Sequence, residues 1–196
     1  MIAVINYDRG KSIALGSILE KLGCEYLLTK NEQEICRADK IILPDSTNID
    51  STVKKLQLLN LASVLRVINK PILGINMGFA VLCKNIVGHG IEGLGLLNNN
   101  VDFFLSHDEF IKEEHTETVE LIGESILLNE ISNFSRFNFS GNLFIPIAEN
   151  TKAKTTITGI DVSAAVETKR VYGIQFNPER SGSNGKKVLS NFVSNA

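Results

Sequence analysis

Short apolar runs alternate with amphipathic segments along the first half of this 196-residue chain. Four runs have the length and composition of buried strands: residues 2–5, 25–29, 41–43 and 72–75. Two longer segments, residues 12–22 and 51–68, instead place their apolar side chains at helical spacing. Because strands that alternate with helices tend to pair in parallel, the pattern predicts an α/β fold with a central, mostly parallel sheet.

The second half of the chain is more polar. Residues 98–141 show strand-like alternation, as in T-E-T-V-E-L-I, which predicts an antiparallel extension of the sheet. The earlier pattern then returns, with R-V-Y-G-I-Q-F as a strand and residues 186–192 as a final helix. Because no linker or repeat interrupts the chain, we expect a single domain over residues 1–196.

Composition argues against several classes of function. The chain is 43% hydrophobic and 21% charged, and its net charge of -2 provides no attraction for nucleic acid. No window approaches the roughly 18 apolar residues of a membrane span, and the start lacks the basic lead of a secretory signal. The cysteines are odd in number and widely spaced, which favours free thiols. We therefore expect a cytoplasmic protein with no nucleic-acid or membrane partner.

The segment P-I-L-G-I-N-M-G-F-A, at residues 71–80, reads as a strand that passes through a glycine-flanked turn into a short helix. In the hydrolase pattern G-x-S-x-G, the central residue of such an elbow is the nucleophile. Here that residue is Asn76, which tolerates the positive φ of a sharp turn. A carboxamide is a poor nucleophile, because its nitrogen lone pair is delocalised and no base can activate it. The segment therefore predicts the geometry of a reaction centre without its chemistry.

Two motifs carry a resemblance to a known family. G-I-N-M-G-F-A resembles the nucleophile motif of class I (triad) glutamine amidotransferases, and Q-F-N-P-E-R-S resembles their second motif, Q-F-H-P-E-x-S. The segments M-I-A-V-I-N-Y, A-D-K-I-I-L-P and E-G-L-G-L are most similar to the glutaminase subunit of imidazole glycerol phosphate synthase. The resemblance covers the whole chain. It implies a flavodoxin-like three-layer fold, no cofactor, and a cyclase-like synthase subunit as partner.

The resemblance also assigns the catalytic positions. In this family a cysteine attacks glutamine, and a histidine oriented by a glutamate activates that cysteine. Asn76 stands at the cysteine position and Asn177 at the histidine position, so Glu179 is the one member of the triad that is retained. A neutral amide at Asn177 has no proton that titrates near pH 7 and cannot act as a general base. Glu179 then has either a residual role in the site or a purely structural one.

The family's substrate-binding positions are altered as well. Its P-G-V-G loop, which supplies an oxyanion amide, reads P-D-S-T here, and Asp45 would bring a negative charge toward a developing oxyanion. The glutamine and glutamate that follow the nucleophile in the family correspond to Ala80 and Lys84. With the elbow itself, the substrate-binding positions that the resemblance implies are Asp45, Gly74, Met77, Gly78, Ala80 and Lys84. The family's cyclase-facing P-H-M-G-W segment has no counterpart in residues 98–129.

The segment H-D-E-F-I-K-E-E-H raises the question of a metal site at His107 and His115. The spacing of these histidines matches no known site, and their acidic surroundings are typical of an exposed hairpin. We therefore expect no metal and place both histidines on such a hairpin.

Two hypotheses about function remain open. The first is a degenerate amidotransferase subunit that is predicted to be unable to hydrolyse glutamine and that acts as a binding or regulatory partner of a synthase. The second is an active glutamine amidotransferase that supplies ammonia to a cyclase-type partner, in histidine biosynthesis or a related amination. Its chemistry would use residues that the motifs do not reveal, or Asn76 and Asn177 would be engineered inactivating changes in an otherwise active protein. The changes at Asp45, Ala80 and Lys84 favour the first, because they extend beyond the nucleophile and its base.

Overall fold

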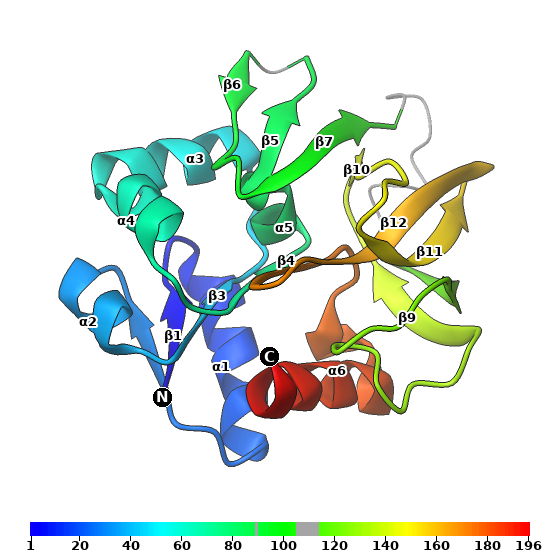
Figure 1. Cartoon of the computed structure of the whole chain (residues 1–196), viewed down its shortest axis with the longest axis horizontal. Helices are drawn as coiled ribbons and strands as arrows, with labels where there is room; N and C mark the ends of the chain where they lie inside the picture. The colour runs from blue at the N-terminus through cyan, green and yellow to red at the C-terminus, as the bar shows by residue number, and fades with distance from the viewer. Residues whose placement is uncertain (89, 105–113) are drawn as a thin grey trace.

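The computed structural model describes residues 1–88, 90–104 and 114–196, and within them nine strands form the main sheet. Their order is β2-β1-β3-β4-β13-β12-β11-β8-β9 (Figure 1). The strands span β1 Ile2–Ile5, β2 Tyr26–Thr29, β3 Lys40–Leu43, β4 Ile72–Ile75, β8 His115–Leu121, β9 Ser135–Phe139, β11 Thr151–Ile157, β12 Ile160–Glu167 and β13 Val171–Ile174.

The sheet has a parallel half and an antiparallel half. The strands β2, β1, β3, β4 and β13 pair in parallel. The strands β12, β11, β8 and β9 continue the sheet in antiparallel pairs. Every residue of β1, β4 and β13 is buried, as expected for strands that are covered on both faces. The predicted α/β fold, with its mostly parallel sheet and antiparallel extension, is confirmed.

Helices cover both faces of the parallel half (Figure 1). They span α1 Arg9–Lys21, α2 Glu32–Arg37, α3 Ile49–Leu58, α4 Leu61–Val67, α5 Met77–Leu82 and α6 Gly182–Asn195, with the 3-10 turn η2 at Pro178–Arg180. The apolar faces of α1 and α6 belong to one core cluster, and those of α2 to α5 belong to another. The result is three layers, with the sheet in the middle. Among the described residues, no helix has the length and apolar character needed to cross a membrane.

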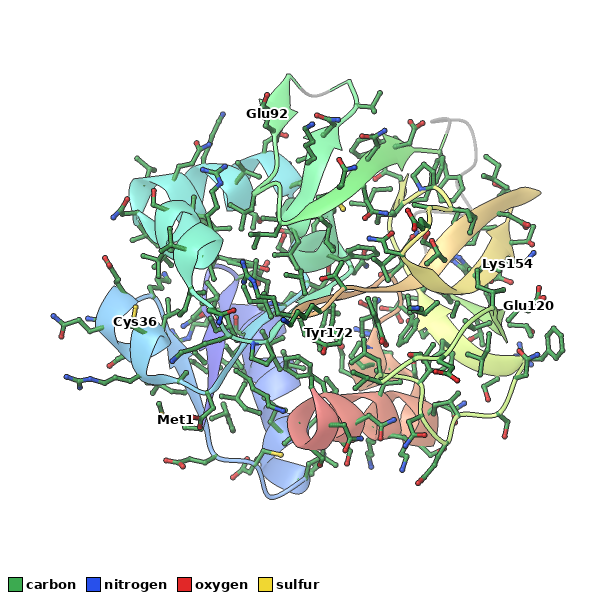
Figure 2. The ribbon with its side chains drawn as sticks, viewed as in Figure 1. Met1, Cys36, Glu92, Glu120, Lys154 and Tyr172 are labelled. Atoms are coloured by element: carbon green, nitrogen blue, oxygen red, sulfur yellow. The ribbon has the colours of Figure 1, made fainter. Side chains whose placement is uncertain are left out.

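Figure 2 shows the contrast between the interior and the rim of the sheet. Tyr172 of β13 lies in the interior, where its ring meets that of Phe192 on α6 edge-on with ring centres 5.8 Å apart. At the rim of the antiparallel half, Lys154 forms an ion pair with Glu120 at 3.5 Å. Aromatic packing therefore joins α6 to the sheet, while exposed ion pairs of this kind add little stability.

Part of the polar segment forms a separate sheet. β7 Leu97–Phe103 pairs with β5 Cys83–Ile86 and with β10 Leu143–Phe144, and β6 Ile91–Glu92 completes the order β10-β7-β5-β6. The prediction that residues 98–141 extend the main sheet is therefore right for β8 and β9 and wrong for β7. The elbow helix α5 leads directly into β5, and β5 takes β7 as its parallel partner.

Helix boundaries differ from the predicted ones at two places inside the chain, and the last helix, predicted over residues 186–192, is also longer, at Gly182–Asn195. The single helix predicted over residues 51–68 is wrong, because α3 ends at Leu58 and α4 begins at Leu61. Between them Asn60 adopts a left-handed conformation with φ 57°, which asparagine tolerates better than most residues. At the other place, α1 begins at Arg9 because the Asp8 side chain accepts a hydrogen bond of 3.3 Å from the backbone N–H of Lys11.

The exposed hairpin predicted for the histidines is wrong for His115. Only 8% of its surface is exposed on β8, and its ring stacks on its cross-strand neighbour Phe139 with ring centres 6.2 Å apart. The alternation of β8 turns this side chain toward the core rather than toward solvent. His107 lies outside the described residues. In the parts of the chain that the structure describes, no group of three or more His, Cys, Asp and Glu residues could hold a metal ion.

Candidate functional site

The predicted elbow joins β4 to α5 at Asn76. The backbone of this residue has φ 47° and ψ -107°, a strained conformation for any residue other than glycine. The flanking glycines permit the sharp turn. A Cβ on Gly78 would lie 2.1 Å from the carbonyl oxygen of Leu43, and one on Gly74 would lie 2.6 Å from the backbone of Phe79. The backbone N–H of Asn76 donates to Ile174 at 2.7 Å, which holds the elbow at the end of β13.

Asn76 and Asn177 are linked through Ser140. Asn76 Nδ2 donates to the Ser140 carbonyl oxygen at 3.0 Å and lies 3.4 Å from Ser140 Oγ. Asn177 Nδ2 donates to the same Oγ at 2.7 Å. The orientation of the Asn76 amide is fixed, because of its two terminal atoms only Nδ2 can donate to a carbonyl oxygen. Ser140 reaches this place because the backbone N–H of Asn177 donates to Asn138 of β9 at 2.8 Å, close to the end of that strand.

The two asparagines of this network are buried, while Ser140 is partly exposed. Asn76 and Asn177 expose only 3% and 1% of their surfaces. Ser140 Oγ accepts hydrogen bonds from the side-chain amides of both asparagines. No imidazole or carboxylate among the described residues accepts a hydrogen bond from it. A serine hydroxyl needs such a base to become a nucleophile. The Oδ1 atoms of Asn76 and Asn177 are buried without a hydrogen-bond partner among the described residues.

The Asp45 carboxylate faces the backbone amide of Met77, the residue that follows the elbow. Its Oδ1 lies 3.4 Å from the backbone nitrogen of Met77, and its Oδ2 lies 2.6 Å from Lys11 Nζ. The carboxylate is only 4% exposed. Tyr7 supports the same loop, because its hydroxyl donates to the carbonyl oxygen of Pro44. Burial, together with the nearby charge of Asp45, raises the pKa of Tyr7, so the phenol stays protonated as this hydrogen bond requires.

Glu179 lies on η2, immediately beyond Asn177 and the end of β13. Burial raises the pKa of its carboxyl group above the ordinary value, and Asp45 raises it further, while a hydrogen bond from its own backbone N–H, Lys11 and Arg180 oppose this shift. Its Oε2 is buried and has no hydrogen-bond partner among the described residues. The side chain lines a pocket of about 340 Å³ that neither Asn76 nor Asn177 lines. Glu179 is therefore only two residues from Asn177 in the sequence, but its side chain faces this pocket and not the network around Ser140.

Comparison with known proteins identifies the family. The family model described as "Glutamine amidotransferase class-I" matches residues 4–196. This chain belongs to that family. Three curated relatives of this class I amidotransferase chain carry the name imidazole glycerol phosphate synthase subunit HisH. Those from Leptospira borgpetersenii and Methanococcus maripaludis (HisH 2) are 31% and 30% identical, and the one from Bacteroides fragilis is 26% identical. The matches cover 98–100% of this chain and of each relative.

Solved structures agree with this family at the level of the fold. A crystal structure described as a glutamine amidotransferase matches with a TM-score of 0.77 at 16% identity, over 98% of this chain and 96% of that chain. PurLQS from Thermotoga maritima matches with a TM-score of 0.68 at 20% identity, over 98% and 96% of the two chains. At these identities the likeness shows that the amidotransferase fold is shared.

The remaining substrate-binding predictions lie in two different surroundings within this amidotransferase domain. The Ala80 side chain is fully buried in the core cluster that also contains Phe79. Lys84 is exposed on β5, beyond the end of the elbow helix. The structure therefore brings Asp45, Met77 and the elbow glycines together around Asn76, while Ala80 and Lys84 point elsewhere.

Sequence reasoning missed two residues of the site. Ser140 directly follows the alternating strand β9, and only the fold shows that it lies between Asn76 and Asn177. Lys11 follows the first strand, and the carboxyl ends of parallel strands meet at one edge of a sheet. That rule places Lys11 near the elbow, although it does not predict the ion pair with Asp45.

Proposed function

We propose that this chain is a degenerate amidotransferase subunit that does not hydrolyse glutamine and that serves as a binding or regulatory partner of a synthase. The observation that carries the proposal is the network of Asn76, Ser140 and Asn177. Two carboxamides occupy the positions that the family resemblance gives to the nucleophile and its base. They are tied to each other through a hydroxyl group instead of facing a substrate.

The network lacks the groups that acyl transfer requires. Covalent catalysis needs a thiol, hydroxyl, amine or carboxylate that a base activates. Asn76 supplies no such group, and Asn177 cannot accept a proton near pH 7. Ser140 does carry a hydroxyl, but the amide groups around it donate hydrogen bonds to its oxygen and none removes its proton. Glutamine hydrolysis by these residues therefore has neither an attacking group nor a base.

Asp45 works against the reaction from the other side of the elbow. The tetrahedral intermediate of acyl transfer carries a negative oxygen, which backbone N–H groups normally stabilise. Here the N–H of Met77 faces Asp45 Oδ1 at 3.4 Å, and Lys11 holds that carboxylate in place. A developing oxyanion would meet a fixed negative charge, so we infer that this part of the site has also lost its catalytic use.

The proposed partner is a cyclase-like synthase subunit that takes ammonia from solution. The support is the full-length likeness to relatives that are named as subunits of imidazole glycerol phosphate synthase. The nine-stranded sheet and the elbow glycines are retained in the described residues. A retained fold with a lost reaction is what a binding role requires. We assign this role to the cytoplasm.

The experiment is affinity capture of the tagged chain from its native host, followed by an assay of the recovered synthase complex. We expect product to form with ammonium chloride and not with L-glutamine as the nitrogen source. Removal of the chain should lower the rate or the stability of the synthase in ammonium chloride. The active-enzyme alternative requires the opposite result, in which L-glutamine supports product formation at a rate comparable to that with ammonium.

A further inference from the structure

A pocket of about 340 Å³ opens at the edge of the sheet where the parallel strands end. It lies between the loop after β1, the start of α1, the loop after β3 and the turn after β13. Its lining includes Asp8, Gly10, Lys11, Thr47, Glu179 and Arg180. The volume lies in the range of small-ligand pockets, and in open α/β sheets ligands bind at this edge.

The two basic side chains of the pocket are already paired with acids. Lys11 Nζ lies 2.6 Å from Asp45 Oδ2, in an ion pair whose acid is buried. Arg180 forms an ion pair with Glu114. These pairs hold both cations on other carboxylates, and from there their charges only partly offset that of Glu179, whose pKa remains raised by burial. Each also sets the position of its side chain, so the basic groups form walls of the pocket rather than its binding centre.

The two acidic side chains of the pocket have no cationic partner. Among the described residues, neither Asp8 nor Glu179 forms an ion pair. Asp8 caps α1 by accepting a hydrogen bond from the backbone N–H of Lys11. Glu179 accepts a hydrogen bond from its own backbone N–H, but its Oε2 is buried and has no hydrogen-bond partner among the described residues. After the ion pairs cancel, these two carboxyl groups leave the pocket with an excess of negative charge and of hydrogen-bond acceptors.

We propose that this pocket binds a protonated alkylamine or a guanidinium group, with Glu179 as its hydrogen-bonding counter-ion. A buried carboxylate oxygen without a partner is costly, and a cation with N–H donors supplies a hydrogen bond to Oε2 of Glu179 together with a positive charge. Burial also raises the pKa of Glu179, because it favours the neutral acid by more than Lys11 and Arg180 oppose. The group belongs either to a free amine or to a lysine or arginine of a partner protein.

This inference rests on the proposed function in one respect. It takes Glu179 to be released from orienting a histidine, since Asn177 stands where that histidine would be and its Nδ2 donates to Ser140 instead. The proposed function and this inference can be refuted independently of each other. An inactive protein that binds no cation would overturn the inference and leave the proposed function standing. A glutamine-hydrolysing protein that binds the cation would do the reverse.

The test is a titration of the full chain labelled with ¹³C at glutamate side chains, at pH 7. The Glu179 carboxyl resonance is assigned by its loss in Glu179→Gln. The probes are n-butylammonium chloride and ethylguanidinium chloride, and tetramethylammonium chloride keeps the ionic strength constant as a cation without N–H donors. We expect a saturable shift of the Glu179 resonance with a donor cation and none with tetramethylammonium. The absence of a saturable shift with either donor cation would overturn the proposal.

Calorimetric titration of variants gives the second readout. Glu179→Gln should weaken n-butylammonium binding by more than about tenfold, because it removes the charged partner of a largely buried pair. Glu92→Gln makes the same change at an exposed strand residue and should alter binding by less than about twofold. Equal affinity in Glu179→Gln and the unsubstituted chain would overturn the proposal. If Glu179→Gln fails to fold, Glu179→Asp, which also removes the glutamate resonance, assigns it, and the titration of the unsubstituted chain decides.

Two capped tripeptides, Gly-Lys-Gly and Gly-Arg-Gly, distinguish the sources of the cation. If a tripeptide binds at least as tightly as the free cation with the same head group, the pocket takes a side chain of a partner protein. If both tripeptides are excluded while n-butylammonium binds, it takes a free amine. If neither the tripeptides nor the free cations bind, the proposal is wrong.

Discussion

Asp45 Oδ1 lies 3.4 Å from the backbone nitrogen of Met77, directly beside the elbow residue Asn76. This distance is long for an N–H···O hydrogen bond, so the contact by itself is weak. Lys11 supplies the stronger restraint, since its Nζ lies 2.6 Å from the other oxygen of the same carboxylate. A fixed negative charge therefore stands where a catalytic elbow would stabilise an oxyanion.

The first prediction concerns repair of the missing residues. The double variant Asn76→Cys with Asn177→His should fold but remain nearly inactive in glutamine hydrolysis, because Asp45 still faces the amide of Met77. The loss of one oxyanion donor typically costs about 10²–10³ in rate. The measurement is glutamate release, together with mass spectrometry of any covalent glutaminyl thioester. Turnover comparable to that of active family members would show that the site is better preserved than we claim.

Asp45→Gly, added to the repaired protein, separates this effect from the others. It frees the Met77 amide and should raise the rate of thioester formation by about 10²-fold. Asp39→Gly makes the same change of charge at an exposed residue that pairs with the N-terminus, and should leave that rate unchanged. Equal effects of the two substitutions would contradict the role given to Asp45.

The second prediction concerns Ser140. Ser140→Ala removes the oxygen that accepts the hydrogen bond of Asn177 Nδ2 and leaves that buried donor unpaired. We expect the free energy of unfolding to fall by about 1–3 kcal/mol, measured by urea denaturation. Ser135→Ala is the control, because its hydroxyl bonds to Ser132 at an exposed position, and it should change stability by less than about 0.5 kcal/mol. Indistinguishable stabilities of the two variants would refute the proposed network.

The third prediction tests the tight turn of the elbow. A Cβ at position 78 would lie 2.1 Å from the Leu43 carbonyl oxygen, so Gly78→Ala should lower the free energy of unfolding by about 1–3 kcal/mol or more. Gly10→Ala is the matched control in α1, where the nearest atom is 3.7 Å away. It should raise stability by about 0.5–1 kcal/mol, because alanine favours a helix more than glycine does. Thermal or urea denaturation of both variants gives the answer.

The local pattern of apolar residues predicted much of this fold. It failed where contacts with residues distant in the sequence determine the structure. The limits of β1 and β4 follow from their apolar runs, because strands covered on both faces need continuous apolar sequence. The break at Asn60 does not disturb the apolar spacing on either side, so periodicity could not reveal it. His115 is buried by its cross-strand partner Phe139, which lies far away in the sequence.

The same distinction applies to the candidate site. The elbow at Asn76 is visible in the sequence because its glycines and its strand are contiguous. Ser140 is not, because it reaches Asn76 across 64 residues through the pairing of β9 with the segment after β13. The position of Asp45 near the elbow is expected from the family resemblance. Its ion pair with Lys11 requires the side-chain geometry of the folded protein.

The fourth prediction concerns pH. Burial raises the folded-state pKa of Glu179 above its ordinary value of 4.5, and among the charged groups that face it Asp45 adds to the shift while Lys11 and Arg180 oppose it. The folded protein then binds more protons than the unfolded chain between the two pKa values. The contribution of Glu179 to stability is therefore fully present below pH 4.5 and is lost as pH rises through the folded-state pKa.

Glu179→Gln provides the reference, because glutamine does not titrate. The free energy of unfolding of the unsubstituted protein minus that of Glu179→Gln should fall as pH rises from about 4 and then level off above the folded-state pKa. Urea denaturation of both proteins between pH 4 and 8 measures this difference. A difference that increases with pH would show that the pKa is lowered on folding, contrary to the burial argument.

Glutamate release from L-glutamine by the purified protein, measured alone and with the synthase captured from its host, tests the central claim most directly. We expect no turnover above the background of the Asn76→Ala variant under either condition, because loss of the nucleophile alone costs on the order of 10⁶ in rate in triad enzymes. Glutamate release well above background, alone or with the synthase, would contradict the account. If that release persisted in Asn76→Ala and disappeared in Ser140→Ala, Ser140 would be the nucleophile that we have excluded.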